Sequence, residues 1–207
     1  MFLYLVRHSE TEANLLSNVY GCSESAYTEE GRRQFDKIVA YFKSVILNVI
    51  HTSVLSRAYL LADRVTAQRQ GINLIINPGF IERNFGELEG KSTIELKQLG
   101  IDLTNISANY CPPNGESQNR FNLRVGRSLL EIVDELITTD KKVAIFSHSG
   151  VIQTILDALR IGYRVVDLGS ISLMEITPEF INPIMINYTR HLRECGMRAN
   201  VCQPCSK

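Results

Sequence analysis

The chain has 207 residues, of which 44% are hydrophobic and 21% charged, the composition of an ordinary globular protein. Its 22 basic residues balance 22 acidic ones, so the net charge argues against a nucleic acid or membrane partner. An anionic ligand would therefore have to be bound by a local cluster of positive charge. No apolar run is long enough to span a bilayer, no secretory signal follows Met1, and the five cysteines lack a disulfide framework, so we expect a cytoplasmic protein.

The first half of the chain alternates short apolar runs with helical patterns. Continuous apolar runs of about five residues predict strands that are buried on both faces, as in a parallel sheet. The predicted elements are, in chain order, a strand at 2–6, a polar loop at 9–27, a helix capped by Thr28 and continuing to Ile46, a strand at 49–52, a helix at about 55–70 and a strand at 74–76.

The second half continues the alternation and ends in a polar segment. The predicted elements are a loop at 80–90, a short helix to about Leu99, a loop through 111–115, a long helix with apolar residues from Phe121 to Leu136, a strand at 143–146, a helix at about 151–159, and late strands at 170–177 and 184–188. We therefore predict an α/β fold, a three-layer α/β/α sandwich with a mostly parallel central sheet, formed by one domain over residues 1–193. Residues 194–207 are predicted to be a mobile, polar, cysteine-containing tail.

Histidine, arginine and glutamate side chains follow the predicted strands close to where each strand ends. Arg7 and His8 follow the first strand, and Arg57 comes soon after the second. Glu82 follows the third strand by a few residues, and His148 follows the strand at 143–146. Because the carboxyl ends of parallel strands meet at one edge of a sheet, we expect these side chains to share one site.

This set of side chains fits phosphoryl transfer. A transferring phosphoryl group spreads negative charge over its oxygens, which arginine side chains bind in pairs. A neutral imidazole is able to attack phosphorus, and the neighbouring cations Arg7 and Arg57 are expected to lower the pKa of His8 and keep it neutral. The departing oxygen needs a proton, and Glu82 is the best-placed acid; the nearby alternatives are Glu10, Glu87 and Glu89.

Five segments resemble those of a known family. RHSETEAN at residues 7–14 resembles the N-terminal signature of the histidine phosphatase superfamily, also called phosphoglycerate-mutase-like proteins. Four later segments resemble the family's other landmarks in the right order: SVLSRA at 53–58, ERNFGELEG at 82–90, PPNGES at 112–117 and FSHSGVIQTIL at 146–156. Each segment is a weak signal alone, and the five in register are specific.

The resemblance implies a role for each candidate residue. His8 is implied to be the phosphorylated nucleophile, with Glu82 as the acid that protonates the leaving oxygen and then activates water. Arg7, Arg57 and His148 are implied to hold the phosphoryl group. We expect the substrate-binding residues to be Asn14, Thr11, Ser149 and Arg83, and we expect neither a metal nor a cofactor, because the arginines and the second histidine supply the positive charge.

The sequence departs from the family pattern at three positions. Ser9 and Ser149 stand directly after the two histidines, where the family often has glycine. Each serine side chain either crowds the pocket or adds a hydroxyl near the phosphate. Leu88 stands where many members have tryptophan, which concerns packing or substrate preference rather than the chemistry.

Three activities remain open, and the length of the segment between the acid loop, residues 82–90, and the long helix favours one of them. Only residues 91–114 intervene, whereas the mutases of the family have a much longer insert. A short insert leaves the pocket open to water, so we predict a phosphomonoester hydrolase acting on a small phosphorylated metabolite. The alternatives are a cofactor-dependent phosphoglycerate mutase and a non-catalytic phosphate-binding protein. Sugar phosphates, nucleotide-loop phosphates and phosphoglycerates all remain candidate substrates, and the sequence does not indicate the oligomeric state.

Overall fold

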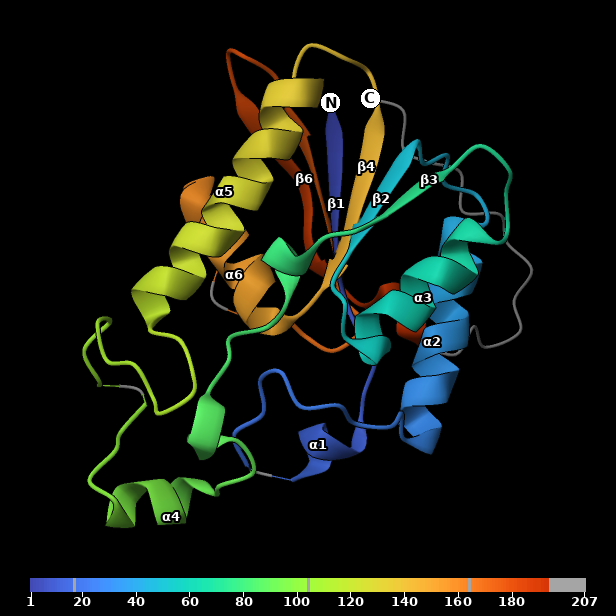
Figure 1. The fold of residues 1–207 in the computed structure, drawn as a ribbon. Coiled ribbons are helices and arrows are strands. Elements are labelled where there is room, and N and C mark those ends of the chain that lie inside the picture. The colour runs from blue at the N-terminus through green and yellow to red at the C-terminus, as the bar shows by residue number, and fades with distance from the viewer. Residues whose placement is uncertain (17, 104, 164, 194–207) are drawn as a thin grey trace.

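A computed structural model describes residues 1–16, 18–103, 105–163 and 165–193; the predicted tail at 194–207 lies outside the described residues. Six strands form one sheet in the order β3-β2-β4-β1-β5-β6 (Figure 1). The strands are β1 (Phe2–Arg7), β2 (Val49–Thr52), β3 (Asn73–Ile76), β4 (Lys142–Ser147), β5 (Ile171–Ile176) and β6 (Ile181–Tyr188). The helices are α1 (Glu12–Leu15), α2 (Glu29–Phe42), α3 (Ser56–Thr66), α4 (Thr93–Gln98), α5 (Gln118–Leu136) and α6 (Ser149–Ala158).

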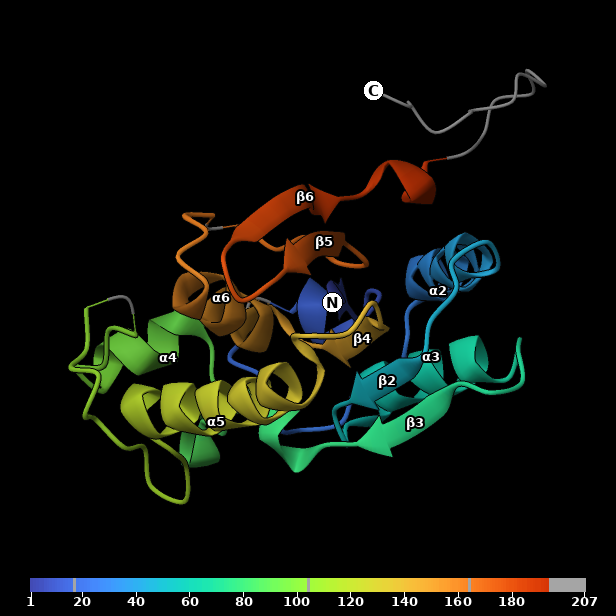
Figure 2. The same ribbon diagram turned by 90° about the horizontal axis from the view of Figure 1, so that it is seen from above.

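Two hydrophobic cores cover the two faces of the sheet. On one face, α5 and α6 pack against apolar side chains that include Leu3, Leu5 and Ile145. On the other face, α2 and α3 pack against side chains that include Val6 and Phe146. Figure 2 shows these two helical layers on opposite sides of the sheet. The arrangement confirms the predicted three-layer α/β/α sandwich and explains why β1 and β4 are continuously apolar.

The central strands run parallel and end side by side. β1 pairs with β4 in parallel, and the last pair in register is Arg7 with Ser147. The backbone N–H of His8 donates to the carbonyl of Ser147 at 3.1 Å. β2 pairs in parallel with both β3 and β4, whereas β5 pairs antiparallel with both β1 and β6. The sheet is therefore mostly parallel, as predicted. The register therefore sets the two histidines at neighbouring strand ends.

The predicted elements differ from the observed ones mainly at their boundaries. Thr28 caps α2 by accepting from the N–H of Gly31, as predicted, but the helix ends at Phe42. The predicted extension to Ile46 is wrong: Ile46 is 60% exposed, and Leu47 is buried in its place as the chain turns toward β2. β6 begins at 181 rather than 184, and the predicted loop at 9–27 contains the short helix α1.

The segments beyond the strand ends form a separate layer. Figure 1 shows α1 and α4 beyond the end of the sheet at which β1 finishes. A short 3₁₀ turn at Pro78–Phe80 follows β3 and buries Phe80 completely, so this residue belongs to the core rather than to the loop predicted from residue 80. In the described parts of the chain, no helix is both long and apolar enough to cross a membrane.

Candidate active site

His8 follows β1 and is held as a neutral imidazole. Its ring nitrogen Nδ1 lies 2.8 Å from the carbonyl oxygen of Ser9, and since a carbonyl only accepts, Nδ1 carries the proton. Burial lowers the pKa of His8 well below its usual 6.5, and the charges of Arg57 and Arg7 lower it further. The other nitrogen, Nε2, is therefore unprotonated and nucleophilic.

Two arginines are held by backbone carbonyls rather than by carboxylates. Arg57, in the first turn of α3, donates from Nη1 to the carbonyl of Ser23 at 2.8 Å and from Nη2 to that of Gly21 at 2.6 Å. Arg7 donates from Nη1 to the carbonyl of Val166 at 2.5 Å. Among the described residues, neither guanidinium takes part in a salt bridge, so their charge remains available for an anion.

His148 lies beside His8 and is completely buried. The two ring centroids are 5.3 Å apart. Nε2 of His148 is 2.8 Å from the hydroxyl oxygen of Ser53, while Nδ1 is buried without a hydrogen-bond partner in the part of the chain that the structure describes. Burial, followed by the electrostatic interaction with the His8 ring and by the charges of Arg57 and Arg7, lowers the pKa of His148 well below 6.5.

Glu82 is held by backbone N–H groups of its own loop and of the start of α6. One carboxylate oxygen accepts from the N–H of Arg83 at 2.9 Å, and the other accepts from the N–H of Gly150 at 3.0 Å. These bonds and the charges of Arg57 and Arg7 favour the ionised form, but burial outweighs them and raises the pKa of Glu82 above its usual 4.5. A larger fraction of this carboxyl is therefore protonated near neutral pH than in an exposed glutamate.

Asn14 has its amide oriented by Thr11. The side-chain oxygen of Asn14 accepts from the backbone N–H and from the hydroxyl of Thr11, both at 2.9 Å. Because a backbone N–H only donates, the oxygen and nitrogen of this amide are assigned without ambiguity. The NH₂ group of Asn14 therefore points away from Thr11 as a donor.

The two serines that follow the histidines lie differently. Ser9 is fully buried, and its hydroxyl has no hydrogen-bond partner in the described ranges. Ser149 is the first residue of α6 and lines the cavity described below. Ser149 is therefore at the site, whereas the hydroxyl of Ser9 is in the protein interior.

A cavity of about 170 Å³ brings most of the predicted site residues together. Of the residues that the structure describes, nine line it: Arg7, His8, Thr11, Ala13, Asn14, Tyr20, Arg57, Glu82 and Ser149. His148 adjoins it through its contact with His8. Arg83 does not line the cavity; its guanidinium donates to Gln118 at 2.9 Å and to the carbonyl of Glu116, and it lies over the ring of Phe85.

Sequence reasoning missed two of the lining residues and the support of Arg57. Ala13 and Tyr20 line the cavity, and the carbonyls of Gly21 and Ser23 orient the guanidinium. All four lie in the segment predicted only as a polar loop, where no periodicity indicates which residues face inward. Tyr20 is one of two tyrosines in this segment, and its residue type alone does not mark it as a lining residue.

The assembled groups suit the transfer of a phosphoryl group to nitrogen. They comprise a nucleophilic nitrogen, two guanidinium groups that form no salt bridge with the residues described, an amide donor and a carboxyl group of raised pKa. In the described ranges, no three His, Cys, Asp or Glu side chains are grouped as a metal ion requires. The tail cysteines 195, 202 and 205 lie outside the described residues.

Comparison with known proteins identifies one family. The sequence model of the histidine phosphatase superfamily (branch 1) matches residues 3–182. The adenosylcobalamin/alpha-ribazole phosphatase of Escherichia coli is 28% identical over 201 residues, which cover 90% of this chain and 96% of that protein. The 2,3-bisphosphoglycerate-dependent phosphoglycerate mutase of Bartonella henselae is 29% identical over 165 residues, which cover 76% of this chain and 80% of that protein.

Solved structures give the same grouping. Bacillus stearothermophilus YhfR superposes with a TM-score of 0.81 at 25% identity and covers 93% of this chain and 99% of its own. A putative alpha-ribazole-5'-P phosphatase from Escherichia coli superposes with a TM-score of 0.80 at 27% identity, covering 91% and 96%. The relatives thus include both phosphatases and mutases.

Proposed function

Because the chain belongs to branch 1 of the histidine phosphatase superfamily, we propose that it is a metal-independent phosphomonoester hydrolase that forms a phosphohistidine at His8. The observation that supports this most directly is the state of the His8 ring. Its Nδ1 proton is bound by a carbonyl, so the free Nε2 is available in a cavity that also contains two guanidinium groups and a carboxyl group.

The substrate phosphoryl group is bound by the positive charges of two arginine side chains that line the cavity. Arg7 and Arg57 donate to the phosphoryl oxygens, and the NH₂ group of Asn14 adds a neutral donor. Ser53 is able to donate its hydroxyl proton to Nε2 of His148, which places the ring proton of His148 on Nδ1. This nitrogen then serves as a further donor to the phosphoryl group.

Transfer to His8 breaks one bond and forms one. Nε2 of His8 attacks phosphorus, a phosphorus–nitrogen bond forms, and the phosphorus–oxygen bond to the leaving group breaks. The leaving oxygen takes the proton of the Glu82 carboxyl, which becomes a carboxylate. The raised pKa of Glu82 fits this role, because an acid donates only while it is protonated.

Hydrolysis reverses the proton transfer. The Glu82 carboxylate removes a proton from a water molecule, and the water oxygen attacks the phosphorus of the phosphohistidine. The phosphorus–nitrogen bond breaks, inorganic phosphate forms, and Nε2 of His8 regains its lone pair. Glu82 is again protonated and the enzyme is restored without a metal ion.

Hydrolysis is favoured over mutase activity by the arrangement of cations at the cavity. Arg83, the cation next to Glu82, is bound to Glu116 and Gln118 and does not line the cavity. Of the described residues that line it, two are cations, and both are needed for the transferred phosphoryl group. A carboxylate or second phosphate, as a bisphosphoglycerate carries, therefore lacks a lining cation.

The test is turnover of a generic phosphate ester in the presence of a chelator. The wild-type protein is expected to release inorganic phosphate, and His8→Ala is expected to release none. Persisting turnover in His8→Ala contradicts the proposal. Isomerisation of phosphoglycerates that depends on a bisphosphate primer identifies the mutase instead, and stabilisation by phosphate without turnover identifies a binding protein.

A further inference from the structure

Glu89 does not line the cavity, yet its carboxylate is saturated with hydrogen bonds. One oxygen accepts from the N–H of Cys22 at 2.8 Å and from the N–H of Phe85 at 3.1 Å. The other accepts from the N–H of Ser23 at 2.8 Å and from the Ser23 hydroxyl. Burial acts to raise the pKa of Glu89, but the bonds from Ser23, Cys22 and Phe85 together hold it below its usual 4.5. The group is thus fixed as a carboxylate.

The donors come from two segments that each carry part of the active site. Cys22 and Ser23 belong to the loop whose carbonyls, those of Gly21 and Ser23, orient Arg57. Phe85 belongs to the loop that begins with Glu82. One carboxylate therefore joins the support of the phosphate-binding arginine to the segment that carries the proton donor.

The two segments are also in direct contact at Gly21. A Cβ atom at this position would lie 2.0 Å from the carbonyl oxygen of Arg83 and 2.6 Å from a carboxylate oxygen of Glu89. Both distances are too short for any side chain. The thiol of Cys22 in addition donates to the carbonyl of Glu82 at 3.3 Å. The relative position of the segments is therefore closely specified.

From these contacts we infer that Glu89 is a positioning residue. It fixes the position of Arg57 relative to that of Glu82, on either side of the substrate phosphoryl group. The inference rests on the proposed function. Glu89 touches neither substrate nor reacting atoms; it acts through the backbone of residues 21–23 and of Phe85. Its loss is expected to weaken phosphate binding and proton donation together.

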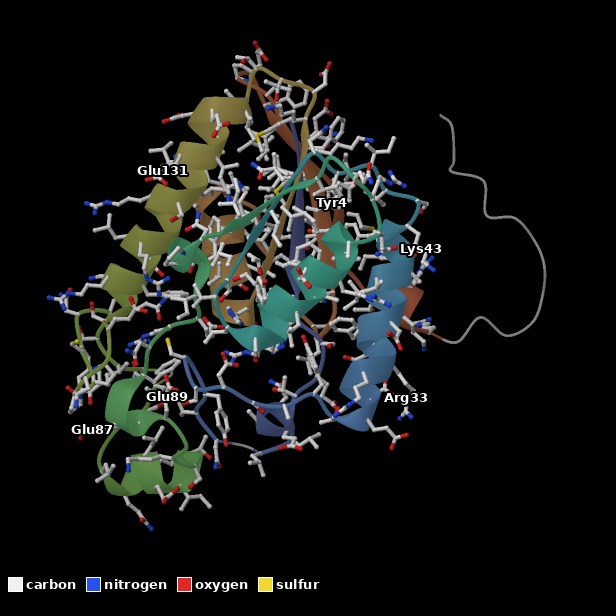
Figure 3. All side chains as sticks on the ribbon, turned by 45° about the vertical axis from the view of Figure 1, so that its right-hand side comes forward. Tyr4, Arg33, Lys43, Glu87, Glu89 and Glu131 are labelled. Carbon is white, nitrogen blue, oxygen red and sulfur yellow. The ribbon has the colours of Figure 1, made fainter. Side chains whose placement is uncertain are left out.

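The variant Glu89→Gln tests this, since it keeps the side-chain shape. Gln turns one acceptor oxygen into an NH₂ group, which faces N–H donors and leaves two of the four bonds without an acceptor. The matched control is Glu87→Gln in the same loop: Glu87 is exposed and its carboxylate bonds to Asn114. Figure 3 shows Glu87 at the outer edge of the molecule and Glu89 further inward.

Two readouts separate positioning from a general structural role. The inhibition constant of inorganic phosphate reports the arginine, and the ratio of kcat/KM for p-nitrophenyl phosphate over glycerol 2-phosphate reports proton donation, because only the poor leaving group needs the acid. In Glu89→Gln we expect the inhibition constant to rise about tenfold. We expect kcat/KM to fall about 100-fold for the glycerol ester and about tenfold for the nitrophenyl ester. Glu87→Gln should match the wild type.

The outcomes are distinguishable from failure of the proposed function. No turnover by the wild type overturns the hydrolase proposal itself. Wild-type turnover with an unchanged phosphate constant and an unchanged ratio in Glu89→Gln overturns the inference alone, even if the melting temperature falls. If Glu89→Gln does not fold, Glu89→Asp takes its place, because it keeps the charge but shortens the reach; wild-type values of both readouts then overturn the inference.

Discussion

The two halves of the active site are held by different means. Arg7, His8 and His148 follow the central strands β1 and β4, and the sheet register sets their backbone positions. Glu82 and Arg57 are instead positioned by hydrogen bonds from loops: Glu82 by the N–H groups of its neighbour and of α6, Arg57 by the carbonyls of residues 21–23.

This difference predicts that substitutions in the two halves have different effects on activity and on stability. The strand half lies on the buried core of the sheet, so a shift of its backbone disturbs many packed side chains. The loop half depends on a few polar contacts, each of which is removable by a single substitution. Variants of the loop half should therefore change rate and leaving-group dependence with little loss of stability.

Glu82→Gln should give the largest effect in the loop half. The amide has no acidic proton, so kcat/KM is expected to fall by about 100- to 10,000-fold for alkyl phosphates. The loss should be much smaller for p-nitrophenyl phosphate, whose leaving group needs no proton. Steady-state kinetics over a series of phosphate esters measures this, and a uniform loss across the series would assign the acid to another residue.

Gly150→Ala should give an intermediate effect. A Cβ at residue 150 would lie 2.5 Å from a carboxylate oxygen of Glu82, so the carboxyl must move. We expect kcat/KM to fall about 10- to 100-fold while the fold is kept. Gly126→Ala in α5 is the control, because its Cβ meets no atom within 4 Å; it should keep full activity and gain about 0.5–1 kcal/mol of stability. Equal activity of the two variants would contradict the proposed contact.

The pH dependence of stability should give the smallest effect and reports on the strand half. The pKa values of His8 and His148 are well below 6.5 in the folded chain, and burial also lowers those of His51 and His191, so the unfolded chain takes up more protons as the pH falls below 6.5. The free energy of unfolding should therefore decrease from pH 7 to pH 5, by up to about 1.4 kcal/mol per pH unit for each histidine.

Urea unfolding of the wild type and of His8→Asn at several pH values measures this dependence. The variant lacks one of the histidines whose pKa is lowered in the folded chain, so its stability should fall less steeply with decreasing pH. Identical slopes in the two proteins would show that His8 does not have the lowered pKa.

The sequence predicts the strand half of the site better than the loop half. The apolar runs at 2–6 and 143–146 mark buried parallel strands, and this alone indicates that Arg7, His8 and His148 meet. The structure brings them together with Glu82 and Arg57 around one cavity and its immediate border. The charges of Arg7 and Arg57 do lower the pKa of His8, but burial, which the sequence does not reveal, is the larger cause.

The loop half depends on backbone conformations that no pattern specifies. Arg83 follows Glu82 directly, yet it bonds to Gln118 while Glu82 lines the cavity. The sequence contains no signal that separates the two neighbours, because the direction of each side chain depends on the conformation of the loop. The carbonyls of Gly21 and Ser23 have no sequence signal at all, because any residue supplies a carbonyl.

The most direct test of the account is to trap the covalent intermediate. Rapid quenching of the protein with a radiolabelled phosphate ester, followed by digestion at alkaline pH, should give one labelled peptide that contains His8. The label should be stable to base, labile to acid and absent from His8→Ala. Continued turnover without any label on His8, or with label on another residue, would contradict a mechanism through this histidine.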